Sequence, residues 1–289
     1  MKCAAVGLLC ALCACSSSRD PAPPSDGQMA QAGRAGDMAL TLNRPQEAMQ
    51  QYRNALQRAE MRDDLPAISD YSYNLAVAEL AANDPAAALK TLRELRAELA
   101  RRSAGGFVAL DLLEATALYR TGARSQAATL AQAIERAGVQ PEAGQAAFLL
   151  GLIADDQDDP AGLAAAAQRL GRPATDAGRA DALELSARLA RRQGDGTAAE
   201  RSAEEAAAIR RELRDYRGIA RALSVAATAA QQAGATSAAA SFYLRAGRSA
   251  AVQGDRQAAR QWLQRAVSLS HDPDLRTAAK ESLAGLDLK

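Results

Sequence analysis

Apolar residues recur along this chain at the spacing of an amphipathic helix. Between turn signals they fall at positions i, i+3, i+4 and i+7, as at Leu75, Ala78 and Ala82, and again at Leu89 and Leu92. No stretch alternates apolar and polar residues for the length of a strand. The pattern therefore predicts an all-α protein.

Turn signals interrupt the helical pattern at seven places. Glycine ends a helix because it accepts the left-handed conformation, and proline begins one because its missing N–H is not needed in a first turn. The seven turns predict seven helix hairpins or part-hairpins, and they are Asn43-Arg44-Pro45, Asn83-Asp84-Pro85, Gly122-Ala123, Asp158-Asp159-Pro160, Gly194-Asp195-Gly196, Gly234-Ala235 and Gly254-Asp255.

One position repeats shortly after each turn, and it is a small residue in six of seven units. The aligned residues are Ala48, Ala88, Ala127, Leu163, Ala199, Ala239 and Ala259, with spacings of 40, 39, 36, 36, 40 and 20. The last spacing is half a unit. We therefore predict that a helix over about residues 236–253 closes one hairpin and opens the next.

The repeated motif resembles that of tetratricopeptide repeat (TPR) proteins, whose unit has roughly 34 residues. Its clearest copy is Tyr243, Ala246, Gly247, Ala250, Gly254-Asp255, Ala259, Leu263 and Ala266; Gly36, Ala39, Ala48, Tyr52 and Ala55 match nearly as well, and Leu150-Gly151 repeats a Leu-Gly pair. The large aromatic residue expected in each first helix is mostly missing, and Leu163 replaces a small residue.

The resemblance covers residues 28–289 and implies a right-handed α-solenoid of about six to seven TPR-like hairpins. A C-terminal helix over about residues 274–286 would cap the last hairpin. Such repeats are protein-binding surfaces, so the resemblance implies a scaffold and no enzyme. Scarce aromatics, at 3%, and abundant alanine fit this expectation, because small side chains let helices approach closely.

The N-terminus carries a second signal. Met1-Lys2 precedes an apolar run from Cys3 to Ala14 that is too short to span a bilayer. The tetrad Leu12-Cys13-Ala14-Cys15 then resembles the lipobox of bacterial lipoproteins, which implies a signal peptide over residues 1–14 and lipidation of Cys15. An ordinary secretory signal cleaved near Ser17 is the alternative.

Residues 15–27 would join the lipid to the solenoid. Three prolines in this Pro/Ser-rich stretch favour an extended tether. Ser16 after the cysteine resembles the outer-membrane form of the signal, so we expect a lipid anchor in the bacterial outer membrane, facing the periplasm. All four cysteines lie in residues 1–15, which excludes a disulfide framework, a thiolate metal site and a cysteine nucleophile from the repeats.

Catalytic and metal-binding constellations are missing from the sequence. His271 is the only histidine and has no partner for a zinc site. The acidic run 155–159 lacks the glycine and glutamate of a calcium loop, and we interpret it as helix capping before Pro160. No phosphate-binding or nucleophile motif is present. We expect no cofactor and no metal.

Arginine makes up 31 of the 35 basic residues. If the register holds, Arg188, Arg192 and Arg221 face the concave side beside Asp181 and Glu184, where arginine forks bind carboxylates of a partner. The alternative is a solvated face whose arginines pair along the helices with acidic neighbours, a set that comprises Arg201, Glu205, Arg210 and Arg214.

An upstream part of the concave face is more apolar. Its candidate partner-binding residues are Tyr73, Val77, Leu112, Thr116, Tyr119 and Phe148, with Leu80 and Leu152 beside them. The alternative is ordinary core between helices. Trp262 and Tyr243 are expected to pack under the C-terminal helix.

Three functional classes follow from these observations. The first is an envelope scaffold that binds a protein or peptide partner. The second is a self-associating structural lipoprotein, and the third is a small-ligand receptor or enzyme. Without residues 1–14 the chain has 34 basic and 34 acidic residues, and this balance argues against a nucleic-acid partner.

Overall fold

The computed structural model describes residues 26–287, and within them every regular element is an α-helix. Cys15 and the predicted signal peptide and tether up to residue 25 lie outside the described residues. The fourteen helices of the described part are α1 (Gly27–Thr41), α2 (Pro45–Met61), α3 (Leu65–Ala81), α4 (Pro85–Arg101), α5 (Val108–Arg120), α6 (Arg124–Ala137), α7 (Glu142–Asp156), α8 (Pro160–Leu170), α9 (Asp176–Arg192), α10 (Gly196–Glu212), α11 (Tyr216–Gln232), α12 (Thr236–Val252), α13 (Arg256–Leu269) and α14 (Pro273–Asp287).

Aspartate side chains begin many of these helices. At six interhelix turns an aspartate oxygen accepts a hydrogen bond from the backbone N–H three residues later, and these caps are Asp64, Asp84, Asp159, Asp195, Asp215 and Asp255. Such a cap satisfies one of the free N–H groups of the first turn and contributes about 1 kcal/mol. The capping interpretation of the acidic run is confirmed for Asp159 and is wrong for Asp155, Asp156 and Asp158, whose carboxylates pair with arginines.

The residue before each capping aspartate adopts the left-handed conformation and closes the preceding helix, and the same conformation recurs before Arg44 and Ala235. Glycine takes this role at Gly194, Gly234 and Gly254, while Asn43 and Asn83 adopt φ of 55° and 64°. Asparagine tolerates this region better than most residues, and unlike glycine it carries a side-chain amide. The two asparagines therefore end their helices and also present a polar group at the turn.

The predicted repeat position is the packing centre of each unit. All seven aligned residues are fully buried, at 0% exposure, and they are Ala48, Ala88, Ala127, Leu163, Ala199, Ala239 and Ala259. A large side chain from one helix fills the space that a small residue leaves on its neighbour. A Cβ on Gly36 would lie 2.5 Å from Cε1 of Tyr52, and one on Gly247 would lie 2.6 Å from Cγ of Leu263.

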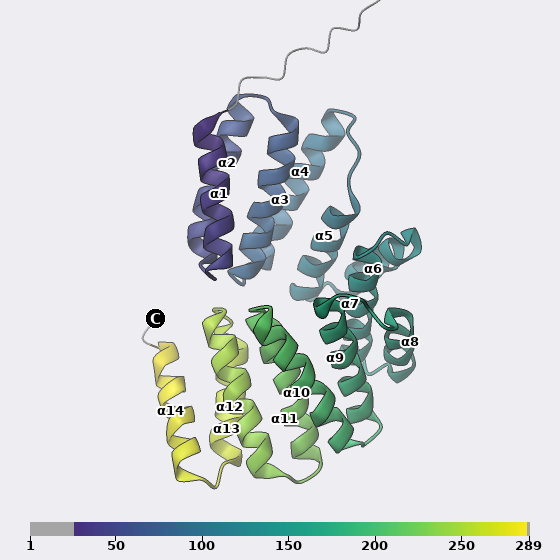
Figure 1. Cartoon of the computed structure of the whole chain (residues 1–289), viewed down its shortest axis with the longest axis vertical. Coiled ribbons are helices and arrows are strands. Elements are labelled where there is room, and N and C mark those ends of the chain that lie inside the picture. Colours follow the sequence, from purple (N-terminus) through teal and green to yellow (C-terminus); the bar gives the residue numbers. More distant parts are fainter. Residues whose placement is uncertain (1–25, 288–289) are drawn as a thin grey trace, which may run out of the picture.

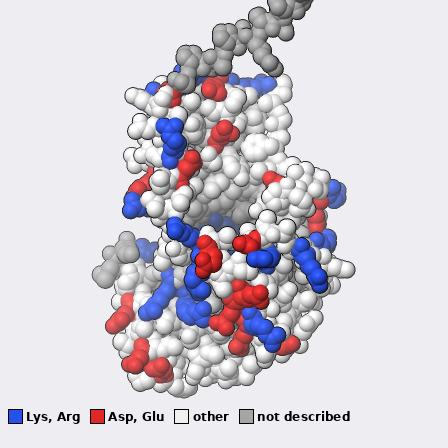
Figure 2. All heavy atoms as spheres, in the orientation of Figure 1, with Lys and Arg blue, Asp and Glu red and all other residues white. Residues whose placement is uncertain are grey.

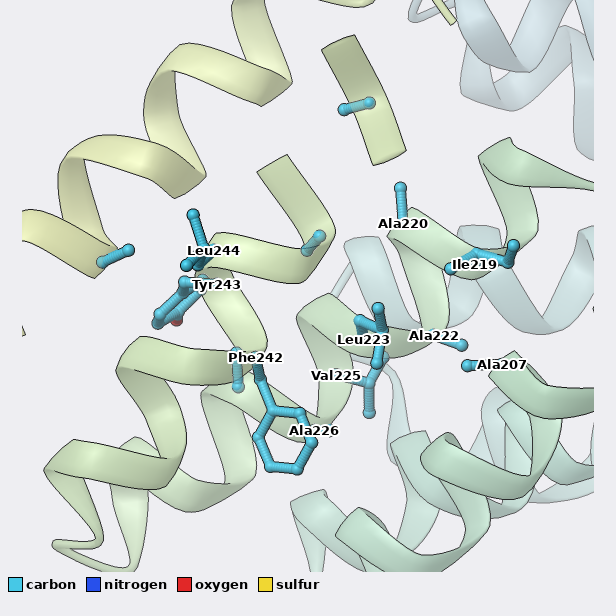
Figure 3. Packing of buried hydrophobic residues seen from close by; sticks show 14 of the residues in the cluster. Ala207, Ile219, Ala220, Ala222, Leu223, Val225, Ala226, Phe242, Tyr243 and Leu244 are labelled. Atoms are coloured by element: carbon cyan, nitrogen blue, oxygen red, sulfur yellow. The ribbon is translucent and has the colours of Figure 1, made fainter. Parts of the chain in front are cut away.

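The largest apolar cluster lies among the last six helices. Figure 3 shows residues of this cluster, with Val225 of α11 near Phe242 of α12, and Tyr243 next to Leu244. Tyr243 is 1% exposed, which confirms its predicted packing role. Leu286 of α14 joins this cluster, so the C-terminal helix covers the last hairpin as the sequence predicted.

The helices pack in consecutive order, each against its neighbours in the chain, and this confirms the TPR-like α-solenoid. The helix predicted over residues 236–253 is α12, which packs against both α11 and α13 as the other interior helices pack against their neighbours. The predicted C-terminal helix begins and ends within one residue of α14.

The solenoid turns back on itself. In Figure 1, α1 to α4 form an upper block, α5 to α9 descend along one side, and α10 to α14 lie below the first block. We call α1 to α4 the N-terminal arc and α11 to α14 the C-terminal arc.

Two hydrogen bonds join the arcs at their facing turns. Nε2 of Gln253 donates to Oδ1 of Asn43 at 3.0 Å, and Nη2 of Arg217 donates to Oδ1 of Asn83 at 3.1 Å. We call this pair the closing contacts. They convert an open concave face into the wall of a cavity.

Candidate functional site

A cavity of about 580 Å³ lies on the concave side, between the arcs. Figure 2 shows the hollow in the middle of the molecule, between the upper and lower blocks. Its wall comes mainly from the first helices of successive hairpins, and the lining residues used below are Tyr73, Leu112, Thr116, Tyr119, Arg120, Phe148, Leu152, Asp181, Arg210, Arg217, Arg221, Gln253, Asp255 and Trp262. This volume lies within the range of about 300–1,000 Å³ for small-molecule sites.

One side of the cavity is apolar and is built by helical periodicity. Leu112 and Thr116 are one turn apart on α5, and Phe148 and Leu152 are one turn apart on α7, so each pair shares a helix face. Tyr119 closes this side. Its hydroxyl donates to Asp156 at 3.1 Å, and burial, with help from the Asp156 charge, raises the pKa of Tyr119 to about 12.

The opposite side is charged, and a buried carboxylate organises it. Glu184 is 0% exposed and accepts hydrogen bonds from Arg188 at 3.0 Å, Arg210 at 3.2 Å and Arg221 at 2.6 and 3.0 Å. Burial acts to raise the pKa of Glu184, but the charges of Arg221 and Arg188 outweigh it and lower the pKa to about 2. Glu184 therefore stays ionised and fixes three guanidinium groups.

A second carboxylate holds the end of α9. Asp155 is 7% exposed and accepts from Arg188 at 2.7 Å, Arg191 at 2.9 Å and Nε of Arg192 at 2.7 Å. Arg192 also pairs with Asp158. Burial acts to raise the pKa of Asp155, but Arg188 and Arg192 more than offset it, and the pKa is lowered. These arginines are bound within the fold.

Two arginines stack on the apolar side and join it to the charged one. The guanidinium carbon of Arg221 lies 5.1 Å from the ring centroid of Phe148, and that of Arg210 lies 5.6 Å from it. Cation–π contacts of this kind contribute about 0.5–2 kcal/mol, more when desolvated. Phe148 is thus held between the cavity and the Glu184 cluster.

A third group of charges lies where the arcs meet. Arg120 donates to the carbonyl of Leu80 at 2.7 Å and to Oδ1 of Asn83 at 2.8 Å, so its bonded partners are neutral. Arg217 donates to the same Asn83 oxygen at 3.1 Å and faces Asp255 at 3.5 Å.

The pKa values of both arginines reflect this crowding. Burial, followed by the charge of Arg217, lowers the pKa of Arg120 to about 10. Burial also lowers the pKa of Arg217, where Asp255 acts in the opposite direction. Two cations and one carboxylate leave an excess positive charge at this end of the cavity.

A smaller hollow adjoins the cavity and shares Tyr73 with it. It has about 430 Å³ and is lined by Asp64, Asp70, Tyr71, Tyr73, Asn74 and Phe107, with Pro66 and Ala67. The rings of Tyr73 and Phe107 lie 5.7 Å apart, and Phe107 is 37% exposed. Tyr73 therefore borders both hollows, and Phe107 extends its aromatic surface along the smaller one. We call Tyr73 and Phe107 the aromatic pair.

The partner-binding residues predicted from the sequence divide into those that line the cavity and those that do not. The cavity brings together Tyr73, Leu112, Thr116, Tyr119, Phe148 and Arg221. Val77 does not line it, and Arg188 and Arg192 are engaged by Asp155 and Glu184 outside it. The alternative of a solvated arginine face is wrong for Arg210, which is 4% exposed because Asp181, Glu184 and Asp215 surround its guanidinium.

Sequence reasoning missed Arg120, Arg217, Asp255 and the cavity role of Trp262. Trp262 packs against the C-terminal cluster as predicted, but it also lines the cavity. In the sequence, Asp255 is recognisable only as part of the turn Gly254-Asp255. No sequence signal links Arg120 to Arg217, because their proximity arises from the closure of the solenoid.

Neither a metal-binding cluster nor a membrane-spanning helix is found within residues 26–287. In this part of the chain no group of histidine, cysteine or acidic side chains has the geometry to hold a metal ion, and His271 is exposed. None of the described helices is long and apolar enough to cross a membrane.

Comparisons with known proteins bear on the fold. No protein-family model matches the chain, and no curated protein matches it. Among solved structures, a TPR protein from Parabacteroides merdae is 14% identical and matches 91% of this chain and 100% of its own, with a TM-score of 0.49.

Two further structures are similar at the same level. The TPR2AB domain of yeast Sti1, solved in complex with pHSP90, is 16% identical over 90% of this chain and 98% of its own, with a TM-score of 0.35. The C-terminal part of a TPR protein from Cytophaga hutchinsonii is 16% identical over 89% and 95%, with a TM-score of 0.43. All three scores are below 0.5, so the assignment to a TPR-like solenoid rests on the consecutive helix hairpins of this chain itself.

Proposed function

We propose that this protein is a scaffold that binds a segment of a partner protein on its concave side. The observation that carries the proposal is the aromatic pair of Tyr73, which borders both hollows, and the exposed Phe107, which lines the smaller one. An exposed aromatic ring at the edge of a concave surface is the kind of anchor that dominates protein interfaces.

The charges around the aromatic pair define the partner segment further. Asp64 and Asp70 line the smaller hollow together with the rings of Tyr71 and Tyr73. Carboxylates beside aromatic faces favour a basic side chain, which gains both an ion pair and a cation–π contact. We therefore expect a segment with a basic residue next to an apolar one.

A photoreactive phenylalanine analogue at Phe107 tests this proposal, since it conserves the ring. We expect a discrete crosslinked partner from this position in cells, and none from the same analogue at Val139, which is 46% exposed and outside both hollows. Equal crosslinking from both positions would reject the concave site. Crosslinks only between copies of the chain would favour the self-associating alternative.

We further propose that the scaffold is anchored by a lipidated Cys15 to the outer membrane and faces the periplasm, where it acts in envelope assembly. The lipobox-like tetrad and the Pro/Ser-rich tether support this placement. Cys15→Ser is expected to abolish palmitate labelling and release the protein from membranes. Ser17→Ala is the control, because it leaves the tetrad intact. Labelling that persists in Cys15→Ser contradicts the proposal.

A further inference from the structure

The end of the cavity at the closing contacts combines two properties that the proposed protein partner does not explain. It is bordered by a cationic pair that contains Arg120 and Arg217, and it continues into the apolar side formed by α5 and α7. Apolar surface next to a fixed excess charge is complementary to an amphiphile of opposite charge.

The charges elsewhere along the cavity are matched, so the excess is local. Five arginines of the Glu184 and Asp155 clusters meet five carboxylates, and these residues are Arg188, Arg191, Arg192, Arg210 and Arg221 with Asp155, Asp158, Asp181, Glu184 and Asp215. At the closing contacts Asp255 pairs with Arg217, and Asp215, which is already bound to Arg210, adds a weaker attraction for Arg217. Arg120 donates to neutral partners and makes no ion pair within the described residues. One further negative group would balance this end.

The positions of the two arginines give such a group a defined place. Both guanidinium groups donate to the same oxygen of Asn83, so an acidic group beside that oxygen is within reach of both. Arginine's planar fork suits carboxylate recognition. Arg221, one turn after Arg217 on α11, stacks on Phe148 and so connects the charged end to the apolar side.

We infer that the cavity is a binding site for a small amphiphilic anion, with one acidic group between Arg120 and Arg217 and an apolar body along Leu112, Phe148 and Trp262. The ligand bridges α5 to the C-terminal arc and thereby holds the closing contacts together. The inference concerns a second ligand and does not rest on the proposed protein partner.

Decanoate and decanol are suitable probes, because they share the apolar chain and differ in the acid. Trp262 is the only tryptophan and lines the cavity, so its fluorescence reports binding to the full chain directly. We expect decanoate to change the emission saturably with one site per chain. It should bind at least about tenfold more tightly than decanol, since hydrogen bonds to a charged group are stronger than neutral ones.

Variants of Arg120 distinguish recognition of the acidic group from binding of the apolar chain. Arg120→Gln should reduce decanoate binding to the level of decanol, while Arg120→Lys keeps a cation and should retain part of the preference. Arg93→Gln, an exposed arginine outside the cavity, should bind as the unmodified protein does.

Several outcomes overturn the inference. If the unmodified protein binds decanoate and decanol with equal affinity, the inference is wrong, and this test needs no variant. The inference is also wrong if Arg120→Gln binds decanoate as tightly as the unmodified protein does. Binding of an apolar peptide with a free carboxylate, in the absence of decanoate binding, would assign the cavity to a protein segment. A crosslink at Phe107 without decanoate preference leaves the scaffold proposal standing and rejects this one.

Discussion

Arg217 donates a hydrogen bond of 3.1 Å to the side-chain oxygen of Asn83, a residue 134 positions earlier in the chain. In a simple solenoid each repeat contacts only its neighbours, so repeats this far apart remain separate. Here the turn after α3 meets the start of α11. The contact is part of what makes a cavity out of a concave surface.

Asn83→Gly tests this contact without straining the turn, because glycine accepts the φ of 64° at this position. We expect a loss of about 1 kcal/mol of stability from the missing hydrogen bonds, and faster hydrogen exchange at the turn after α3. Small-angle scattering should show a larger radius of gyration as the arcs separate. Ser103→Gly is the matched control at φ of 55°, and an equal expansion there would contradict the closing role.

Removal of the Glu184 charge is expected to destabilise the fold strongly. Glu184→Gln leaves Arg188, Arg210 and Arg221 without their shared carboxylate in a buried site, and breaking a buried pair costs about 3–5 kcal/mol. Glu204→Gln removes an exposed pair with Arg245 and should cost at most about 1 kcal/mol. Urea denaturation measures both. Similar losses of stability in the two variants would show that the buried Glu184 cluster contributes no more to stability than an exposed ion pair.

Gly36 is expected to be intolerant of even one methyl group. A Cβ there would meet the ring of Tyr52, which is 1% exposed and held by a hydrogen bond of 2.7 Å to Asp37. Gly36→Ala should therefore cost about 1–3 kcal/mol through overpacking, more than the gain in helix propensity returns.

Gly285→Ala provides the matched control on α14, because a Cβ there meets no atom within 4 Å. Helix propensity alone should then stabilise the protein by about 0.5–1 kcal/mol. Thermal unfolding followed by circular dichroism should move in opposite directions for the two variants. A stabilised Gly36→Ala would mean that Tyr52 is free to move aside.

Asp181 should give the protein a distinct pH dependence. Burial raises the pKa of Asp181 to about 6, although Arg210 and Arg221 act against the shift, whereas its ordinary value is 3.8. Between these values the folded protein binds more protons at this site than the unfolded chain does. The contribution of Asp181 to the free energy of unfolding therefore decreases as the pH rises through this window.

Asp181→Asn should remove this dependence. From pH 4.5 to 6 the stability of the variant relative to the unmodified protein is expected to rise by about 1–2 kcal/mol. The window begins at 4.5 because Glu184, with its pKa lowered to about 2, loses its own contribution below that pH. Parallel pH profiles of the two proteins in urea denaturation would contradict the raised pKa of Asp181.

The sequence by itself determined the helices and their order. Local signals carry this information, because a left-handed residue, an aspartate cap and a small residue at a fixed distance act within one hairpin. Leu112 with Thr116 and Phe148 with Leu152 were placed on one face by the helical period alone. The Cys15 interpretation also belongs to the sequence and remains a prediction.

Only the tertiary structure decided which charged side chains are paired inside the fold and which line the cavity. The sequence predicts the concave face for both Arg188 and Arg221, and Glu184 binds both. Yet Arg188 is also engaged by Asp155, while Arg221 stacks on Phe148 and lines the cavity. Arg120 and Arg217 meet because small rotations between successive hairpins add up until the arcs face each other. That accumulated curvature depends on the packing of every helix pair, so no local pattern contains it.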